Sequence, residues 1–194
     1  MNTPSHAIIN LAILGRSQQP EFNLIIVLGG ILPDLPIFGF YFWAKFITHL
    51  PGEKIWTEAY YQPAVQNLVS LFHSIPLALL GWLIAYRFGS EWVQLLCLSM
   101  VLHSLGDLPV HNHDAHQHFY PFSNYRLISP LSYWDPKHYG SIVAFLEMGL
   151  VLLSTARVFP LVHSIVGKIL LIAVNSFYIT MYVYFYARFL VASS

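Results

Sequence analysis

The sequence has few charged residues and almost no cysteine, and both shortages narrow what the chain can be. Charged side chains make up only 9% of the 194 residues, against about a quarter in an ordinary soluble domain. The single cysteine, Cys97, excludes a disulfide within the chain and a zinc site built from cysteines. The lysines and arginines are scattered singly, so the chain lacks the basic patch with which proteins bind nucleic acid through bulk charge.

Apolar residues make up 56% of the chain and the mean hydropathy is +0.57, values that favour a membrane protein. Several segments approach the length that crosses a bilayer, about 20 residues. We therefore expect an all-α, multi-pass bundle in the cell membrane, with four or five apolar helices behind a short N-terminal helix and a long ordered His-rich loop. We expect it to form a single domain over residues 1–194. The expected membrane segments are 23–46, 68–86, 92–110, 142–156 and 169–187.

One of these segments is interrupted. The run "GGILPDLP", residues 29–36, places glycines, prolines and Asp34 within an apolar stretch, which predicts a kinked or broken helix there and at no other position. At the N-terminus, Thr3 can cap a helix with Pro4 in its first turn, and Gly15 can end it. That helix carries His6 in its first turn.

The stretch "VLHSLGDLPVHNHDAHQHF", residues 101–119, holds the most polar chemistry of the chain, with five histidines and two aspartates. His103 and Asp107 are spaced i, i+4 and share one helix face, which His111 continues if the helix passes Pro109. Imidazole and carboxylate together suit Zn²⁺ or a similar divalent ion. The remaining histidines exceed the ligands of one tetrahedral ion, which indicates two ions, or one ion with extra catalytic groups.

Three further polar residues, His6, Asp34 and His73, lie in apolar segments, where a lipid-facing ionisable group is costly. We expect them to join His103 and Asp107 in one pocket that at least four helices build. Each also has a simpler interpretation. His6 could face water, Asp34 could cap a half-helix, and His73 could be hydrogen-bonded between helices.

The sequence leaves two alternatives for the role of Glu147 and two for the loop that follows the histidine-rich stretch. Glu147 could pair with Arg126 or Arg157 inside the bundle, or it could be a ligand. The stretch "SYWDPKHYG", residues 132–140, could form a substrate rim, with Arg126 available to hold a phosphate through its planar guanidinium, or it could be a tightly folded aromatic loop at the membrane interface.

Four short motifs, "TPSHA", "LPD", "FHS" and "HSLGD", resemble in order and rough spacing those of the bacterial membrane-bound, metal-dependent hydrolases, whose prototype is a LexA-regulated inner-membrane protein. The resemblance covers roughly residues 3–110 and implies that the histidines and aspartates of these motifs bind the metal. "HSLGDLPVH" is also similar to the His-x-x-Gly-Asp segment of zinc-dependent phospholipase C and of single-strand nucleases. That similarity implies phosphoester hydrolysis.

The function expected from these observations is a membrane-bound hydrolase that uses one or two divalent ions, most simply Zn²⁺, to activate water against an amphiphilic or phosphoester substrate. Asp114 and His111 are the candidates for the general base, and Arg126 for binding the substrate. The alternatives are a metal or proton transporter and a membrane protein with a purely structural metal. The expected metal ligands are His6, Asp34, His73, His103, Asp107 and His111.

Overall fold

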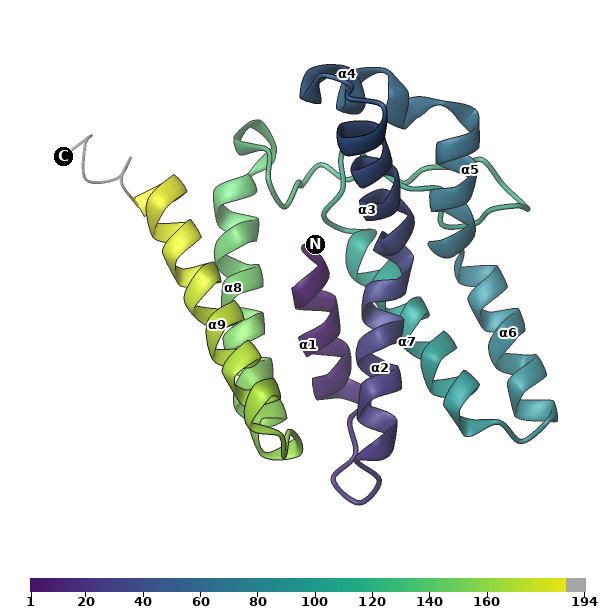
Figure 1. The fold of residues 1–194 in the computed structure, drawn as a ribbon, viewed down its shortest axis with the longest axis vertical. Coiled ribbons are helices and arrows are strands. Elements are labelled where there is room, and N and C mark those ends of the chain that lie inside the picture. The colour runs from purple at the N-terminus through teal and green to yellow at the C-terminus, as the bar shows by residue number, and fades with distance from the viewer. Residues whose placement is uncertain (188–194) are drawn as a thin grey trace.

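The computed structural model describes residues 1–187, and over that range the chain consists of helices, turns and loops without a strand (Figure 1). The expected all-α class is confirmed, while residues 188–194 of the expected domain lie outside the described range. The helices are α1 (Thr3–Leu14), α2 (Glu21–Ile31), α3 (Leu35–Phe42), α4 (Gly52–Thr57), α5 (Pro63–Phe72), α6 (Ile75–Arg87), α7 (Glu91–Asp107), α8 (Gly140–Val158) and α9 (Ile165–Tyr182).

Three helical stretches are long and apolar enough to cross a membrane, namely Glu21–Ile47, Gly140–Leu161 and Ile165–Tyr186. The bent pair α5 and α6 adds a fourth if it counts as one span. The expected count of four or five is therefore not confirmed. Helix α7 has 17 residues and α1 has 12, and these two helices complete the bundle. The apolar helices are compatible with a membrane location.

Two helical stretches are irregular. A 3₁₀ turn, Leu32–Asp34, lies between α2 and α3 within the continuous stretch Glu21–Ile47, so the irregularity expected there is a local change of helix geometry. The expectation of one continuous helix over residues 68–86 is wrong, since α5 ends at Phe72 and α6 begins at Ile75 after a bend of 43°. Pro76 explains this break, because its backbone nitrogen has no hydrogen to donate and its ring would clash with the carbonyl of Phe72 in a continuous helix.

Helix α1 lies inside the bundle between α2 and α8 (Figure 1). It runs parallel to α8, and two side chains of α8 bind its ends. Glu147 accepts hydrogen bonds from the Asn2 backbone N–H at 2.8 Å and from the Ser5 hydroxyl at 2.5 Å, and Arg157 donates to the Ala12 carbonyl at 2.5 Å. An acid at the N-terminus and a cation at the C-terminus satisfy the unpaired backbone groups and complement the helix dipole. Glu147 therefore holds α1 in place and does not pair with an arginine.

Helix α2 packs against its neighbours with backbone in contact. A Cβ atom on Gly29 would lie 2.6 Å from both the Leu96 carbonyl oxygen and the Ser99 Cβ of α7. On Gly30 it would lie 3.0 Å from the Ala7 Cα of α1. Small residues permit such close helix packing in membranes. The apolar core formed around these contacts contains Ile8, Leu11, Ala12, Phe22, Ile26, Leu95, Val151, Val158 and Leu171.

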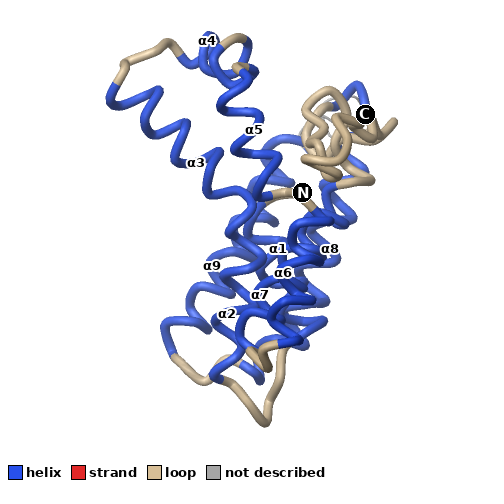
Figure 2. The backbone as a smooth tube through the Cα atoms, turned by 90° about the vertical axis from the view of Figure 1, so that its right-hand side faces the viewer, coloured by secondary structure: helices blue, strands red, loops and turns tan. Residues whose placement is uncertain are grey.

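At one end of the molecule, α3, α4 and α5 extend as an arm beyond the other helices (Figure 2). The long loop over residues 108–139 lies at the same end, as does the N-terminus (Figures 1 and 2). The break in each of the two spans lies at the base of this arm. Polar side chains placed at the breaks are therefore close to the loop and to the first turn of α1.

We expect Gly29→Ala to destabilise the protein by about 1–3 kcal/mol, because the added methyl group collides with backbone that cannot rotate away. Gly149→Ala is the matched control, because no atom lies within 4 Å of a Cβ added at that position of α8. Thermal unfolding of the purified protein in detergent measures both. Equal unfolding temperatures for the two variants would contradict the close packing of α2 on α7.

Candidate metal centre

Imidazoles and carboxylates from four parts of the fold meet at the level of the two helix breaks. The structure brings together all five residues that were expected to share a pocket, and it adds His116. His6 belongs to α1, Asp34 to the turn after α2, His73 follows α5, and His103 and Asp107 lie in the last turns of α7. Three groups have their donor atoms within 4.8 Å of one another, namely His6 with His103 and Asp107, Asp34 with His73 and His103, and His73 with Asp107 and His116.

The backbone determines which nitrogen of His73 and of His103 is free. The Nδ1 atom of His73 lies 2.9 Å from the Val69 carbonyl, and that of His103 lies 2.8 Å from the Gly30 carbonyl. Because a carbonyl can only accept, Nδ1 carries the proton and donates in both rings. In the neutral form, the lone pair is then on Nε2. Both Nε2 atoms are buried and have no hydrogen-bond partner.

These two lone pairs face two carboxylate oxygens. His73 Nε2 lies 3.5 Å from Asp34 Oδ1 and 3.9 Å from Asp107 Oδ2. His103 Nε2 lies 3.6 Å and 3.1 Å from the same two atoms. Two ligand atoms at about 2.1 Å from one zinc ion are about 3.4 Å apart in a tetrahedron. The observed separations bracket that value, so these donors suit a divalent cation. The sets that could each hold one ion are the three triads, since among the described residues no set of four has all its donor atoms within 4.8 Å of one another.

The same arrangement without a cation would be unfavourable. Lone pairs on two nitrogens and two oxygens would face one another among buried side chains, and each unsatisfied buried group costs about 1–3 kcal/mol. Protonating both rings would instead place two positive charges in rings whose centroids are 5.2 Å apart. A divalent ion bound by the donors of one triad would relieve this. The Nδ1 hydrogen bond of His73 stays within α5, while its Nε2 faces Asp34 and Asp107 of other elements.

Thr3 orients the Asp34 carboxylate. Its hydroxyl donates to Asp34 Oδ2 at 2.5 Å and leaves Oδ1 directed at the two imidazoles. The expectation that Thr3 caps α1 is wrong, because the helix already includes Thr3 and its hydroxyl is bound to this stronger acceptor. Asp34 makes no capping bond to α3 either. The expected end of α1 at Gly15 is confirmed.

The second oxygen of Asp107 serves a different set of groups. Oδ1 lies 2.9 Å from His6 Nε2, 3.2 Å from His111 Nε2 and 2.6 Å from the Met1 amino group. Asp107 can therefore bridge two positions, with Oδ2 facing His103 and His73 and Oδ1 facing His6 and His111. The interpretation that His6 faces water is wrong, since its side chain is fully buried. Its Nδ1 atom has no hydrogen-bond partner.

His111 and Asp114 lie next to this cluster, although α7 ends at Asp107 and a turn replaces the expected helical continuation. The His111 Nδ1 atom lies 3.1 Å from Asp114 Oδ2, which also accepts from Trp134 Nε1 at 3.1 Å. Burial raises the pKa of Asp114, but the hydrogen bonds from His111 and Trp134 outweigh burial and lower it to about 2. Asp114 is therefore ionised and orients the His111 ring.

His116 is the member of the cluster that sequence reasoning did not assign. Its ring stacks on His73 with the centroids 4.2 Å apart, and burial lowers its pKa well below the usual value. Burial likewise lowers the pKa of His118 to about 4. Both rings are therefore neutral at pH 7 and can offer a lone pair. The surplus of histidines in the loop was the available signal, but without helical spacing it could not identify which histidine turns inward.

A cavity of about 1100 Å³ opens beside the cluster, between the arm and the long loop. Asp34, His111, Asp114 and His116 form part of its wall, so the cluster is accessible to a ligand. Aromatic rings form much of the remainder. They are Phe38, Trp56, Tyr60, Tyr61, Tyr133 and Trp134.

Arg126 lies elsewhere. Its guanidinium donates to the Ala115 carbonyl and, at 2.9 Å, to Gln66 Oε1, which fastens the long loop to α5. It is not among the residues that line the cavity. Its role in holding a phosphate stays a prediction that the cavity wall does not support.

We expect the purified protein to contain at least one tightly bound divalent ion per chain, because buried lone pairs and carboxylates need a cation. His103→Ala should lose that ion, whereas His49→Asn should retain it, since His49 is exposed and its positive φ of 54° suits asparagine. Elemental analysis measures the content. A chelator should lower the unfolding temperature of the wild type and of His49→Asn but not of His103→Ala, and identical responses would contradict the site.

Comparison of the chain with family models, with curated proteins and with solved structures finds no match. The resemblance of the four motifs to membrane-bound metal-dependent hydrolases therefore stays a prediction. The geometry of the cluster and of its cavity is what indicates a function.

Proposed function

We propose that the protein is a membrane-bound, metal-dependent hydrolase that cleaves a phosphoester. One observation carries the proposal. Buried imidazole and carboxylate donors converge at distances that suit a divalent ion, and some of them form the wall of an open cavity. A His and Asp set of this kind fits Zn²⁺. Structural zinc sites are closed, whereas catalytic sites keep a position open for water or substrate, and so the cavity favours catalysis over a structural clamp.

A divalent ion in such a site polarises a phosphoryl oxygen and lowers the pKa of water. The residues of the chain divide the remaining work. His73 and His103 supply nitrogen ligands, and Asp34 and Asp107 supply anionic oxygen. The second oxygen of Asp107 lies between His6 and His111. In the overall reaction, a water oxygen bonds to phosphorus, the bond from phosphorus to the leaving oxygen breaks, and that oxygen takes up a proton.

His111 is the proposed general base, with Asp114 as the group that orients it. The pair is linked by the 3.1 Å contact between His111 Nδ1 and Asp114 Oδ2, and both residues line the cavity. A carboxylate bound to the far nitrogen raises the basicity of an imidazole. The apolar helices around this site are compatible with a membrane, which supports an amphiphilic phosphoester as the proposed substrate class.

A carrier of metal ions or protons is the second candidate, and the bend between α5 and α6 together with the 3₁₀ turn after α2 favours it. Transporters often bind their cargo where discontinuous helices meet, and here the breaks at Asp34 and at His73 lie at the same cluster. The sequence indicated only the first break. The carrier predicts uptake of zinc by sealed vesicles that contain the protein, without any hydrolysis.

We expect the zinc-loaded protein to hydrolyse bis(para-nitrophenyl) phosphate and Asp107→Asn to lower kcat/KM by more than about 100-fold. Mutating even a residue that only hydrogen-bonds a metal ligand typically lowers metal affinity or activity by about 10–100-fold. Release of para-nitrophenol measures the rate. His49→Asn is the matched control and should hydrolyse at the wild-type rate. Zinc uptake into vesicles without hydrolysis would replace the hydrolase with the carrier.

A further inference from the structure

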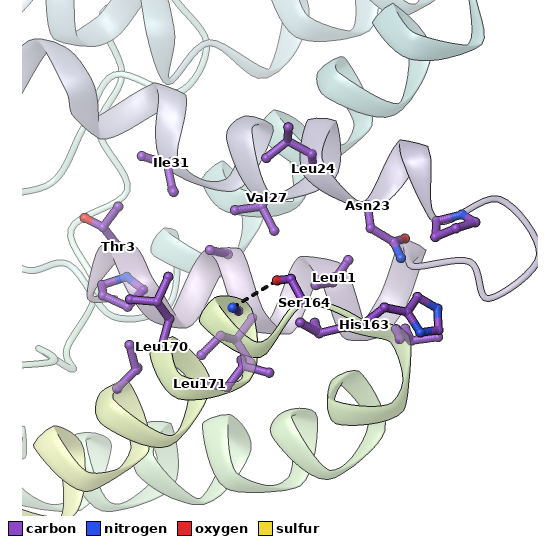
Figure 3. Close-up of a pocket in the computed structure, with 18 residues that line it drawn as sticks. Thr3, Leu11, Asn23, Leu24, Val27, Ile31, His163, Ser164, Leu170 and Leu171 are labelled. Carbon is purple, nitrogen blue, oxygen red and sulfur yellow. Dashed lines mark hydrogen bonds between the residues drawn. The ribbon is translucent and has the colours of Figure 1, made fainter.

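A second, apolar cavity of about 620 Å³ lies along α1 and is separate from the aromatic cavity above the cluster (Figure 3). We call it the α1 groove. Ala7, Ile8 and Leu11 of α1 form its buried floor. Its walls are Leu24, Val27 and Ile31 of α2 on one side and Leu161, Val162, His163, Ser164, Gly167, Leu170, Leu171 and Val174 on the other.

One end of the α1 groove reaches the candidate metal centre. Thr3 and Ile31 lie at that end, and Asn23 and His163 lie at the opposite end (Figure 3). Thr3 and Pro4 line both the groove and the aromatic cavity. The Thr3 hydroxyl is also the group that binds Asp34. A molecule held in the groove would therefore have one end beside the carboxylates and imidazoles.

The groove opens on the apolar outer surface that a membrane would cover. Its rim residues Leu24 and Leu170 are 66% and 59% exposed, and both lie in stretches long and apolar enough to span a bilayer. The floor from Thr3 to Leu11 rises by about 12 Å at 1.5 Å per residue. That length is comparable with the hydrocarbon depth of one leaflet, which is about 15 Å.

We propose that the α1 groove binds one alkyl chain of a membrane lipid phosphoester, whose phosphoryl group then lies at the metal centre. This inference rests on the proposed hydrolase and names its substrate class. The groove is apolar for most of its length and adjoins the site, through Thr3 and Pro4, at one end only, which suits a molecule with a single polar head and a long tail. A volume of about 620 Å³ along a floor of about 12 Å leaves too little room for a helix of a second copy, which with its side chains is about 10–12 Å across.

The groove contributes position more than affinity. Lipid tails are as apolar as the groove, so moving a chain into it removes no apolar surface from water. Its benefit is that the bound chain fixes the distance between the phosphoryl group and the cluster. Holding a reacting group in place raises the rate of the chemical step, so filling the groove should lower kcat/KM for a chain-bearing substrate.

A matched pair of substrates tests the proposal. Hexadecyl para-nitrophenyl phosphate and methyl para-nitrophenyl phosphate share the leaving group and the reacting centre and differ in the chain alone. We expect Val27→Trp and Leu170→Trp, which fill the α1 groove from opposite walls, to lower the ratio of kcat/KM for the hexadecyl ester to kcat/KM for the methyl ester by about tenfold. Leu153→Trp is the control, because Leu153 on α8 is 73% exposed and lies outside the groove.

An unchanged ratio in both groove variants would overturn the alkyl-chain site while leaving the hydrolase intact. A wild type that cleaves neither ester would instead refute the hydrolase. Photo-cross-linking of the zinc-loaded wild type then tests whether the groove binds an alkyl chain, independently of any hydrolysis. A hexadecyl phosphonate with a diazirine in its chain should label peptides around Leu24, Val27 and Leu170, with competition from unlabelled hexadecyl phosphonate.

Each other labelling pattern contradicts the site. Labels spread equally over the lipid-facing surface of α8, including Leu153, would identify ordinary surrounding lipid. Cross-links between two chains at the groove would identify a second copy as its occupant. If the tryptophan variants unfold at temperatures near that of the wild type, a loss of turnover cannot be attributed to misfolding.

Discussion

Two carboxylates and two imidazole nitrogens without hydrogen-bond partners converge inside an apolar bundle, and such a set favours a cation among them. The carbonyls of Val69 and Gly30 hold the rings with Nε2 directed inward, so the rings cannot turn their donors toward Asp34 and Asp107. The rest of the site follows from this constraint. Thr3 binds the outer oxygen of Asp34, the Asp114 contact orients His111, and the cavity opens where these groups meet.

The broken helices explain how an apolar chain can assemble so many polar donors. A continuous helix can supply a ligand from its middle only through a polar side chain that points toward a neighbouring helix, because its backbone groups are hydrogen-bonded to one another. The breaks after α2 and after α5 instead free backbone and side chains at one level. Proline favours both breaks, and at each break one of the metal-site side chains, Asp34 or His73, emerges beside the end of α7.

The sequence predicted which side chains converge better than it predicted the helices that carry them. The clustering of His6, Asp34, His73, His103 and Asp107 could be expected because ionisable groups in apolar segments have few stable alternatives. The break at His73 was missed because its flanks are as apolar as a continuous helix. His116 was missed because a loop without periodicity does not reveal which side chain turns inward. The role of Glu147 depends on which helix end lies opposite it, and only tertiary structure determines that.

Helix α1 links the polar and apolar halves of the molecule. Glu147 and Arg157 bind its two ends, its first turn carries His6 into the cluster, and its next turns form the floor of the α1 groove. A shift of this helix along its axis would move His6 away from Asp107 and would shorten or lengthen the path from groove to cluster by the same amount. A helix of 12 residues, too short to cross the bilayer by itself, would therefore set the distance between the proposed lipid chain and the side chains of the candidate metal centre.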